Sequence, residues 1–387
     1  MEYSRTQPDP RETILLVDDT PDNLRLLSQI LAERQYQVRA VTNGERALET
    51  AQLVPPDLIL LDIRMPGMDG FNVCRALKMI AVTKDIPVIF ISALDDVSDK
   101  VKAFEVGGVD YITKPFQYEE VVARVETHLA LRRLQRELEQ SNRKMAHELT
   151  LAGEVQATFL PEKMPEIDGW QFSVTLQPAR ETSGDFFDMF TLPDGRLGIL
   201  VADVVDKGVS AALFMSLCYA LFRTHVQQFP DEPERVFEAM NANILRDTNA
   251  NQFATAFYGI LDPQSGVMVY ANAGHPPPLI IGEGYGRMVR WLANTGVPLG
   301  VLPECRWQRR EVLIAPQDVL FLYTDGVTEA EENPHSPFGL ERLLTSAQAQ
   351  LGGTAPAVKE GVIKDIHHFT ANRPPQDDLL LLVIKRD

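Results

Sequence analysis

Five residues in the first third of the chain, each next to a short apolar run, could together accept a phosphoryl group. They are Asp18, Asp19, Asp62, Ser92 and Lys114. The adjacent carboxylates of Asp18 and Asp19 can hold a hard divalent cation through oxygen, and the cation would offset charge repulsion near Asp62. The Asp62 carboxylate could then attack a phosphoryl donor to give an acyl phosphate. Ser92 and Lys114 can hydrogen-bond and neutralise the phosphoryl oxygens. Any one aspartate at a strand end is more often a cap or turn residue, but capping does not explain all five.

The segments that carry these residues predict a doubly wound parallel sheet, because buried apolar runs alternate with amphipathic stretches. The runs are Ile14–Val17, Gln37–Val41, Leu58–Leu61, Val88–Ile91 and a short one around Tyr111 and Ile112. The stretches between them include Asp22–Arg34, Glu45–Leu53 and Gly70–Met79. In this architecture the site lies beyond the carboxyl ends of the strands, so the five residues are expected to meet at one edge of the sheet.

Residues 11–131 resemble the receiver domain of two-component response regulators, through the strings LLVDD, LLDIRMPGMDG, ISA and YITKPF. The resemblance implies a flavodoxin-like α/β fold, Asp62 as the phosphoacceptor and a sensor histidine kinase as a partner. It implies a Mg²⁺ site formed by Asp18, Asp19, Asp62 and the backbone carbonyl of Arg64. It also implies switch roles for Ser92, Tyr111 and Lys114, and a bond before Pro115 that is cis in many relatives.

Four aspartates in the second half of the chain lie against strand-like runs and glycines. They are Asp185 in SGDFFD, Asp203 at the end of LGILVAD, Asp325 in VLFLYTDG and Asp377 at the start of DDLLLLVI. Burying a carboxylate is unfavourable unless it is paired or coordinates a metal, so four converging carboxylates would require cations. Two divalent cations would clamp a phosphoryl group and activate water, and an all-oxygen ligand set favours Mg²⁺ or Mn²⁺ over Zn²⁺. Taken singly, each aspartate is again more often a cap.

The same half of the chain predicts an α+β domain, arranged as a sheet sandwich flanked by helices. Its boundary is the Pro- and Gly-rich segment LPEKMPEIDGW, and DPQSG is a good hairpin turn. Strand-like runs occupy Trp170–Leu176, Leu197–Ala202, Phe253–Leu261, Val267–Asn272, Leu279–Gly282, Met288–Leu292, Trp307–Ile314, Val319–Tyr323 and Leu379–Lys385. Helical patterns occupy Ser210–Gln228, Glu232–Thr248, Leu340–Leu351 and Ala357–Phe369.

Residues from Glu154 to Arg386 resemble the metal-dependent PP2C-type protein phosphatases, in the bacterial branch of the sporulation and stress-response (SpoIIE/RsbU-like) enzymes. The matching strings are QATFLP, PARETSGDFFD, ADVVDKGVSAALFM, FATAFYGILD, AGHPPPL, GVPLG, YTDGVTEA and DDLLLLVI. The resemblance implies two Mn²⁺ or Mg²⁺ ions held by Asp185, Asp203, Asp325 and Asp377, with the Val204 carbonyl as a further ligand. The implied substrate is a phosphoserine or phosphothreonine on an anti-sigma-factor antagonist, within a partner-switching pathway.

This half of the chain departs from the pattern of its relatives at three positions. Many relatives read SGKG where this chain has VDKG, which adds an acid at Asp206. Val205 stands where the eukaryotic-type enzymes have a histidine, so the leaving group must be protonated by water or by another residue. Leu380 replaces a threonine in the final motif, which is expected to matter little.

Three further motifs each allow two interpretations. His275 in AGHPPP is either a catalytic acid or, as we favour, a loop histidine bonded to the backbone. The glycine-rich run Gly282–Gly286 resembles a phosphate-binding loop, but it lacks the surrounding βα unit and is better explained as a hairpin loop. His147 in MAHELT resembles a kinase phosphoacceptor, yet no ATP-binding lid follows it, which favours an ordinary solvent-facing histidine.

The segment between the two domains predicts a long helix that pairs with a second copy of itself. From about Glu119 to Phe159 it contains no proline and only one glycine, Gly153. A seam recurs every ~3.5 residues, as in coiled coils. Its positions are Leu131, Leu134, Leu138, Ser141, Met145, Glu148, Ala152, Val155 and Phe159. The predicted organisation is therefore a disordered tail (1–10), a receiver (11–131), a helical coiled-coil linker (132–159) and a phosphatase domain (160–387), with a homodimer formed through the linker.

Composition restricts the function further. The net charge is −17, which disfavours direct binding to nucleic acid. No apolar run approaches the ~20 residues of a membrane span, and three scattered cysteines favour a reducing cytoplasm. The sequence thus predicts a response regulator whose phosphorylation at Asp62 controls a metal-dependent serine/threonine phosphatase. The alternative is a catalytically weak protein that sequesters its partner, for which Asp206 is the support, whereas a DNA-binding regulator is opposed by the charge.

Overall fold

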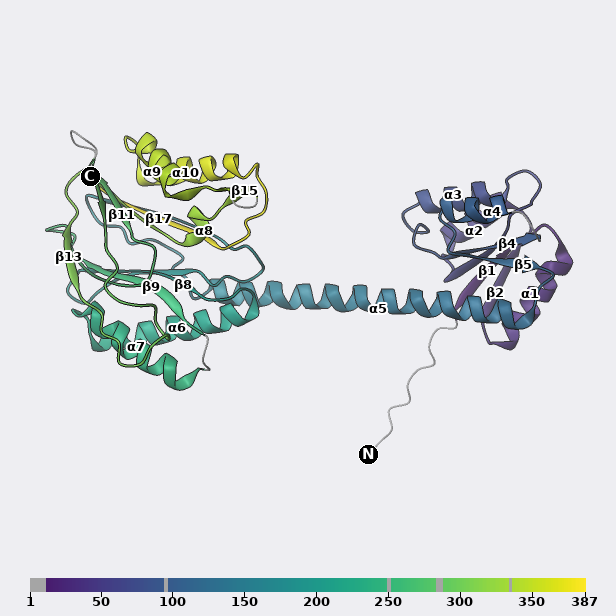
Figure 1. Ribbon diagram of the computed structural model, residues 1–387, viewed down its shortest axis with the longest axis horizontal. Helices are drawn as coiled ribbons and strands as arrows, with labels where there is room; N and C mark the ends of the chain where they lie inside the picture. Colours follow the sequence, from purple (N-terminus) through teal and green to yellow (C-terminus); the bar gives the residue numbers. More distant parts are fainter. Residues whose placement is uncertain (1–11, 94–96, 249–251, 283–287, 334–335) are drawn as a thin grey trace, which may run out of the picture. The chain divides into compact units, whose positions relative to one another are not determined.

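The computed structural model of the chain describes residues 12–93, 97–248, 252–282, 288–333 and 336–387 (Figure 1). The predicted tail (1–10) and most of the glycine-rich run Gly282–Gly286 lie outside these residues. The chain divides into two compact units, Met1–Lys144 and Met145–Asp387, and the division falls inside one long helix. Each unit is described by itself.

The first unit is the predicted doubly wound sheet. All five strands are parallel, in the order β2-β1-β3-β4-β5, which is the flavodoxin-like order. The strands are β1 (Thr13–Val17), β2 (Gln37–Val41), β3 (Leu58–Asp62), β4 (Val88–Ala93) and β5 (Asp110–Lys114). Helices α1 (Pro21–Glu33) and α5 (Tyr118–Ala157) cover one face, and α2 (Gly44–Leu53), α3 (Gly70–Met79) and α4 (Val97–Glu105) cover the other. Because both faces are covered, the central strands are apolar throughout, as the sequence indicated.

Helix α5 contains 40 residues and confirms the predicted long helix to within two residues at each end. Its first turns pack on the sheet through Val121, Val125 and Leu129. Attachment continues past the predicted end of the receiver, since Arg132 Nη1 donates to the carbonyls of Pro56 (3.1 Å) and Asp57 (2.5 Å). The start of the predicted linker therefore belongs physically to the first unit.

The second unit is a sandwich of two five-stranded sheets between two helical layers (Figure 1). One sheet has the order β13-β10-β9-β8-β7 and packs on α6 (Val209–Gln228) and α7 (Pro233–Asp247). The other has the order β12-β11-β14-β17-β6 and packs on α9 (Gly339–Gln350) and α10 (Ala355–Phe369). A third apolar cluster fills the space between the sheets. The strands are β6 (Trp170–Gln177), β7 (Phe186–Thr191), β8 (Leu197–Val204), β9 (Ala254–Leu261), β10 (Val267–Ala273), β11 (Leu279–Gly282), β12 (Val289–Trp291), β13 (Arg310–Leu313), β14 (Asp318–Tyr323) and β17 (Leu379–Arg386).

Most predicted elements of this unit are present, and three features were not predicted. The hairpin at Asp262–Gly266 joins β9 and β10 as predicted. Strand β7 was not predicted as a strand, because a run of only six residues shows little pattern of its own; it forms by antiparallel pairing with β8. The short helix α8 (Asp325–Thr328) and the two-stranded pair β15 (Glu331–Asn333) and β16 (Ser336–Pro337) were also missed.

Helix α6 is the one helix, within the part of the chain that the structure describes, that is long and apolar enough to cross a membrane. A helix in the core of a folded domain passes the same test, and Phe214, Met215 and Phe222 of α6 are buried against the β8–β9 sheet.

Candidate functional site

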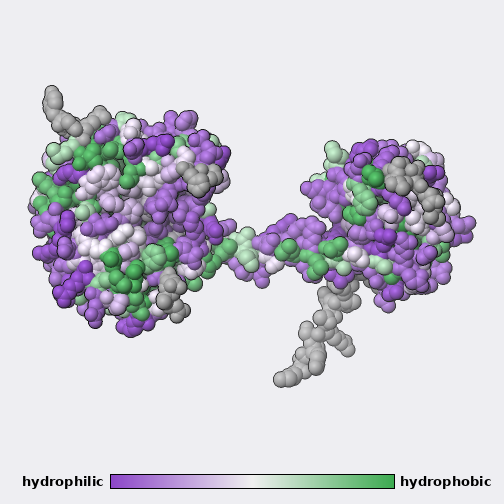
Figure 2. Space-filling view, in the orientation of Figure 1, coloured by the Kyte–Doolittle hydropathy of each residue, from purple (hydrophilic) through white to green (hydrophobic). Residues whose placement is uncertain are grey.

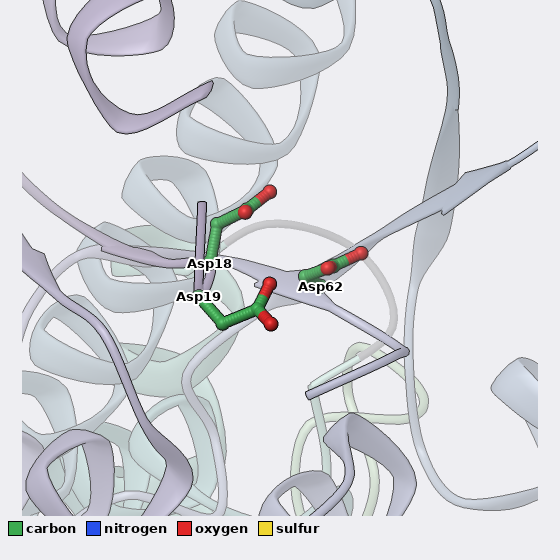
Figure 3. A group of neighbouring side chains, drawn as sticks. All are labelled: Asp18, Asp19 and Asp62. Carbon is green, nitrogen blue, oxygen red and sulfur yellow. The ribbon is translucent and has the colours of Figure 1, made fainter. Parts of the chain in front are cut away.

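The first acidic site lies at the carboxyl edge of the parallel sheet (Figure 3). Asp18 and Asp19 directly follow β1, and Asp62 ends β3, the neighbouring strand. One carboxylate oxygen from each of the three lies within 4.8 Å of the others, and among the described residues this is the one such group. Asp18 and Asp62 are buried, whereas Asp19 is exposed. An all-carboxylate cluster open on one side has the chemistry of a Mg²⁺ site that keeps coordination positions for water and phosphate.

Lys114 joins this site from the end of β5. Its Nζ lies 2.9 Å from Asp18 Oδ2 and 3.1 Å from Asp62 Oδ1. Burial lowers the pKa of Lys114, but its hydrogen bond to Asp18 and the charge of Asp62 outweigh burial, so the pKa is raised overall. Burial also raises the pKa of Asp62, against the opposing charge of Lys114. Lys114 therefore stays cationic beside a carboxylate that needs its charge neutralised.

The remaining residues predicted for the receiver surround this edge. Ser92 is buried near the end of β4, one residue beyond Ile91, which is the register partner of Asp62. Tyr111 is half-buried on β5, where Lys100 Nζ lies 4.6 Å from its ring centre. The Lys114–Pro115 bond is cis, as the resemblance implied. Arg64 lies two residues beyond Asp62, and metal ligation by its carbonyl stays a prediction.

Burial and the charges of neighbouring aspartates raise the pKa values of three of the four predicted aspartates of the second unit. Burial, and then the charge of Asp203, raise the pKa of Asp185 well above its usual range. Burial and the charge of Asp325 raise the pKa of Asp203 to about 7. Burial and the charge of Asp377 raise the pKa of Asp325. Such mutual effects require proximity, so we call Asp185, Asp203, Asp325 and Asp377 the carboxylate cluster.

The carboxylate cluster has the donors that divalent cations require. Asp185 is buried and Asp203 is partly buried, and the charge of Asp203 raises the pKa of Asp185, so the two neighbouring carboxyl groups need a proton or a cation between them. No three of the four bring one oxygen each within 4.8 Å of one another, in contrast to the receiver trio.

The loop before Asp185 is held by a residue that the sequence did not single out. Asp378, adjacent to Asp377, accepts hydrogen bonds from Ala179 N (2.7 Å), Ser183 Oγ (3.0 Å) and Gly184 N (2.6 Å). Gly184 in turn lies against the Val204 carbonyl, because a Cβ there would come within 3.1 Å of that oxygen. The doubled aspartate was a signal that could have been used: one member faces the cluster and the other anchors the loop.

A second missed residue, Thr324, orients Asp185 directly. The fully buried Thr324 hydroxyl donates to Asp185 Oδ2 at 2.6 Å and accepts the Leu380 N–H at 3.1 Å. The threonine hydroxyl thus uses its donor on Asp185 and an acceptor lone pair on the Leu380 N–H, which fixes one oxygen of Asp185.

Two charged groups lie at the open side of the carboxylate cluster. Lys207 Nζ lies 2.9 Å from Asp377 Oδ2 and donates to the Gln376 carbonyl at 2.8 Å. Asp206, next to it, is exposed with φ +83°, and its carboxylate accepts the Lys207 N–H at 2.9 Å. Asp206 is therefore an exposed turn residue between Asp203 and Lys207.

The interpretation of His275 as a catalytic acid is wrong. Its side chain is fully buried, and burial lowers its pKa to about 3. Nδ1 lies 2.9 Å from Thr255 Oγ1, while Asn272 bonds both backbone groups of His275. His275 therefore stays neutral inside the fold, as the favoured interpretation of a structural loop histidine expected. His147 is exposed on α5.

The last turns of α5 contact the loop that leads to Asp185. Gln156 is buried, its Nε2 donates to the Ser183 carbonyl at 2.5 Å, and its Oε1 accepts the Ser183 N–H at 2.9 Å. Gly153, one turn earlier, lies so close to Glu181 that a Cβ would come within 2.0 Å of its carbonyl oxygen. The single glycine of the long helix is thus explained by a close approach of two backbones.

Comparisons with known proteins find one family in each unit. The family described as Stage II sporulation protein E (SpoIIE) matches residues 193–387, and the response regulator receiver domain matches residues 14–126. Protein IcfG of Synechocystis sp. is 33% identical over 229 residues, which cover 52% of this chain and 36% of that protein. Response regulator PleD of Caulobacter vibrioides is 46% identical over 114 residues, which cover 30% of this chain and 25% of PleD. The chain therefore spans well under half the length of these two relatives.

Two solved structures match the second unit. The SiaA-PP2C domain of Pseudomonas aeruginosa aligns with a TM-score of 0.57 at 20% identity, covering 64% of this chain and 98% of that one, and shows that the fold is shared. The RsbU and RsbW domains of Rv1364c from Mycobacterium tuberculosis align with a TM-score of 0.51 at 26% identity, covering 59% of this chain and 63% of that one.

The sandwich and the strings around its carboxylate cluster therefore have a common explanation. The chain belongs to the SpoIIE family of PP2C-type domains and carries a response regulator receiver domain ahead of it.

Proposed function

We propose that this protein is a response regulator whose output is the metal-dependent dephosphorylation of phosphoserine or phosphothreonine in a protein. The observation that carries the proposal is the carboxylate cluster, in which burial and the charges of neighbouring carboxylates raise the pKa values of Asp185, Asp203 and Asp325 within a PP2C-type fold. An arrangement of this kind is unstable without cations and is costly to keep for a purely structural purpose.

In the proposed reaction, Asp185, Asp203, Asp325 and Asp377, with the Val204 carbonyl, hold two Mn²⁺ or Mg²⁺ ions. When bound, these cations supply Lewis acidity toward the phosphoryl oxygens and the attacking water. Thr324 holds one Asp185 oxygen in place, and Asp378 holds the preceding loop. Lys207, at the open side, offers an ammonium group near the position of the phosphate, where it can neutralise charge on the phosphoryl group.

We further propose that a sensor histidine kinase supplies a phosphoryl group to Asp62. The carboxylate of Asp62 would attack the phosphoryl group, with Asp18, Asp19 and the Arg64 carbonyl holding Mg²⁺. Lys114 already contacts Asp62 and would then bind a phosphoryl oxygen. Ser92 and Tyr111 would complete the switch by responding to the new charge.

The route from receiver to phosphatase would run through α5. At one end the helix is tied to the receiver by Arg132, and at the other Gln156 and Gly153 contact the loop that carries Asp185. A displacement of the last turns of α5 would therefore move a proposed metal ligand, which is a direct physical means of control. Phosphorylation would act by changing the position or pairing of the helix.

The occupant proposed for the seam of α5 is a second copy of the chain. Leu131, Leu134, Leu138, Met145 and Val155 are each 57% to 62% exposed, although they repeat at coiled-coil spacing. Figure 2 shows apolar side chains alternating with hydrophilic ones along this helix. Phe159 differs, because it also packs against Tyr219 in its own unit. A cytoplasmic homodimer, with no role for nucleic acid or membrane, is the proposed assembly.

The proposed substrate is an anti-sigma-factor antagonist phosphorylated on serine or threonine. One structural neighbour contains RsbU and RsbW domains in a single protein, which supports a partner-switching role. The alternative is a binding protein that sequesters such a partner without turnover. Its support is Asp206, an exposed turn residue whose carboxylate accepts the Lys207 N–H.

The test is phosphate release from a phosphoserine peptide, measured with Mn²⁺ and with chelator. Turnover should require the metal and should be lost in Asp203→Asn. Asp206→Asn is the matched control, since it makes the same chemical change three residues away at an exposed turn, and it should retain turnover. If the peptide stays intact with Mn²⁺, also when the receiver carries a phosphoryl mimic such as beryllofluoride, the binding-protein alternative gains.

A further inference from the structure

A fully buried histidine lies between the two sheets of the sandwich, behind the carboxylate cluster. Val201 and Phe257 belong to the apolar cluster between the sheets, and Asp203 and Thr255 lie two residues from them on the same strands. Asp203 and Thr255 therefore face the same space, because side chains alternate along a strand. His275 reaches this space from the turn after β10, and its Nδ1 lies 2.9 Å from Thr255 Oγ1.

The turn that carries His275 holds the ring in place. Asn272 Nδ2 donates to the His275 carbonyl at 3.1 Å, and Asn272 Oδ1 accepts the His275 N–H at 2.8 Å. Gly274, between them, has φ +69°, and a Cβ there would come within 2.6 Å of the Pro298 ring. Glycine is therefore required at this position, and the turn presents the imidazole to Thr255 in one orientation.

Thr255 connects this histidine to the carboxylate cluster. It lies directly opposite Asp203 in the antiparallel pairing of β9 with β8. Side chains at directly opposite positions share a face of the sheet, with their Cβ atoms about 4.5–5.5 Å apart. The Thr255 hydroxyl is thus within reach of the Asp203 carboxylate, so that His275, Thr255 and Asp203 form a continuous row of polar groups.

The hydrogen-bonding pattern indicates which way the protons point along this row. His275 is neutral, so only one of its ring nitrogens carries a proton. Among the described residues Nε2 finds no hydrogen bond of ordinary geometry, although the Tyr323 backbone is close enough to affect the ring. A proton on Nδ1, in contrast, is donated to Thr255 Oγ1. A hydroxyl that accepts from Nδ1 keeps its own proton, and Asp203 is the acceptor opposite it.

A purely structural role explains less of this arrangement. Thr255 is only half-buried, so water could satisfy its hydroxyl without a histidine. An apolar side chain in place of His275 would fill the space between the sheets without burying a polar ring, which is unfavourable by itself. The buried imidazole is better explained by its effect on the hydroxyl beside Asp203.

We propose that His275 is a positioning residue for the carboxylate cluster: its Nδ1–H orients the Thr255 hydroxyl, which donates to Asp203 and holds that carboxylate ready to bind a cation. The inference rests on the proposed phosphatase function, in which Asp203 is a cation ligand. Groups that hydrogen-bond to a ligating side chain fix its orientation, and their loss lowers metal affinity or activity about 10–100-fold.

The experiment measures Mn²⁺ binding to the full-length protein by titration calorimetry, together with turnover of a phosphoserine peptide. Thr255→Val keeps the shape of the side chain and removes the hydroxyl, so the Kd for Mn²⁺ should rise about 10–100-fold. Thr255→Ser restores a hydroxyl and should bind Mn²⁺ more nearly like the wild type than like Thr255→Val. Thr175→Val is the matched control, because it makes the same change at a half-buried position on β6, in the groove beside α10, and it should bind like the wild type.

Two variants of His275 test the direction of the hydrogen bond. His275→Asn places an amide near the position of Nδ1, whereas His275→Gln places one near the position of Nε2. The asparagine variant should therefore retain more Mn²⁺ affinity than the glutamine variant, and the reverse order would overturn the assignment. Because His275 acts through the hydroxyl, His275→Gln combined with Thr255→Val should bind no more weakly than Thr255→Val alone, and additive losses would contradict the proposal.

Thermal melting in chelator separates positioning from a structural role. A Thr255→Val variant that melts lower than the wild type but binds Mn²⁺ equally well would show a structural role and overturn the inference. If the histidine variants do not fold, the threonine series decides the question. Equal Mn²⁺ affinity and turnover in Thr255→Val and the wild type would overturn the inference and leave the phosphatase intact. A wild type that binds no Mn²⁺ and releases no phosphate would overturn the proposed function itself.

Discussion

Substitution of Gly153 by alanine sets two physical effects of opposite sign against each other. Within a helix, alanine is favoured over glycine by about 1 kcal/mol, so helix propensity alone predicts a more stable protein. The structure predicts the reverse, because the added Cβ would lie 2.0 Å from the carbonyl oxygen of Glu181. Ordinary contacts begin near 3.4 Å, so helix and loop must separate by about 1.4 Å (3.4 minus 2.0). Overpacking of this kind costs about 1–3 kcal/mol, so the net change is a destabilisation of up to about 2 kcal/mol.

The effect on catalysis should exceed the effect on stability. Glu181 precedes Asp185 by four residues, and the loop between them is held by Gln156 and Asp378. A displacement of about 1 Å at a catalytic group can lower the rate about a hundredfold. We therefore expect Gly153→Ala to lower kcat/KM by about tenfold to a hundredfold and to raise the Mn²⁺ concentration needed for half-maximal activity.

The matched control is Gly352→Ala, where an added Cβ would meet no atom within 4 Å. That variant should gain up to about 1 kcal/mol and keep the activity of the wild type. Thermal melting and a Mn²⁺ titration of peptide turnover measure both quantities. If Gly153→Ala melts above the wild type and needs no more Mn²⁺, the gain in helix propensity exceeds the cost of the contact with Glu181. The close approach of α5 to the loop then does not constrain the site.

Three further predictions follow from the same contacts. Gln156→Ala leaves the buried N–H and C=O of Ser183 unpaired, at roughly 1–3 kcal/mol each, and should lower both the melting temperature and the affinity for Mn²⁺. Gln135 is exposed on the same helix, so Gln135→Ala should change neither quantity. Equal behaviour of the two variants would contradict the coupling between α5 and the loop. In chelator, the melting temperature should rise as the pH falls from about 8 to about 6, because the pKa of Asp203 is higher in the folded protein than in the unfolded chain. The stabilisation that comes from protonating Asp203 is complete below the unfolded pKa near 3.9 and is lost as the pH rises through about 7. Asp203→Asn should flatten that dependence, and an unchanged slope would assign it to other groups. The double variant Leu134→Asp, Leu138→Asp removes two leucines per chain from the proposed seam, at about 1.5–3 kcal/mol for each buried side chain, and should raise the dimer Kd measured by sedimentation at least a hundredfold. Asn142→Asp lies off the seam and should leave the Kd unchanged. A monomeric wild type would refute the dimer.

Most helices and strands, and the acidic residues beside them, could be predicted from the sequence. Parallel strands buried on both faces must be apolar throughout, so the runs LILL and VIFI predicted strands. The residues that follow such strands meet at the carboxyl edge of the sheet regardless of loop length and sequence. The long helix was legible because a 3.5-residue seam persists without a proline. Strand β7 was not, because its pattern is short and its strand character comes from pairing with β8.

What holds the proposed site together is a property of the tertiary structure. Aspartate letters alone do not show that Asp377 faces the carboxylate cluster while Asp378 binds the loop at Gly184, since neighbouring residues at a strand start point in opposite directions. From the sequence, Gly153 is only a residue of low helix propensity; the structure shows that it lies against Glu181, 28 positions later (181 minus 153). His275 reads as a candidate acid until burial lowers its pKa to about 3. Sequence determines which groups are available and on which elements they lie, because secondary-structure periods are local; burial and long-range contacts decide which of those groups can react, because pKa values and close approaches depend on atoms distant in the chain.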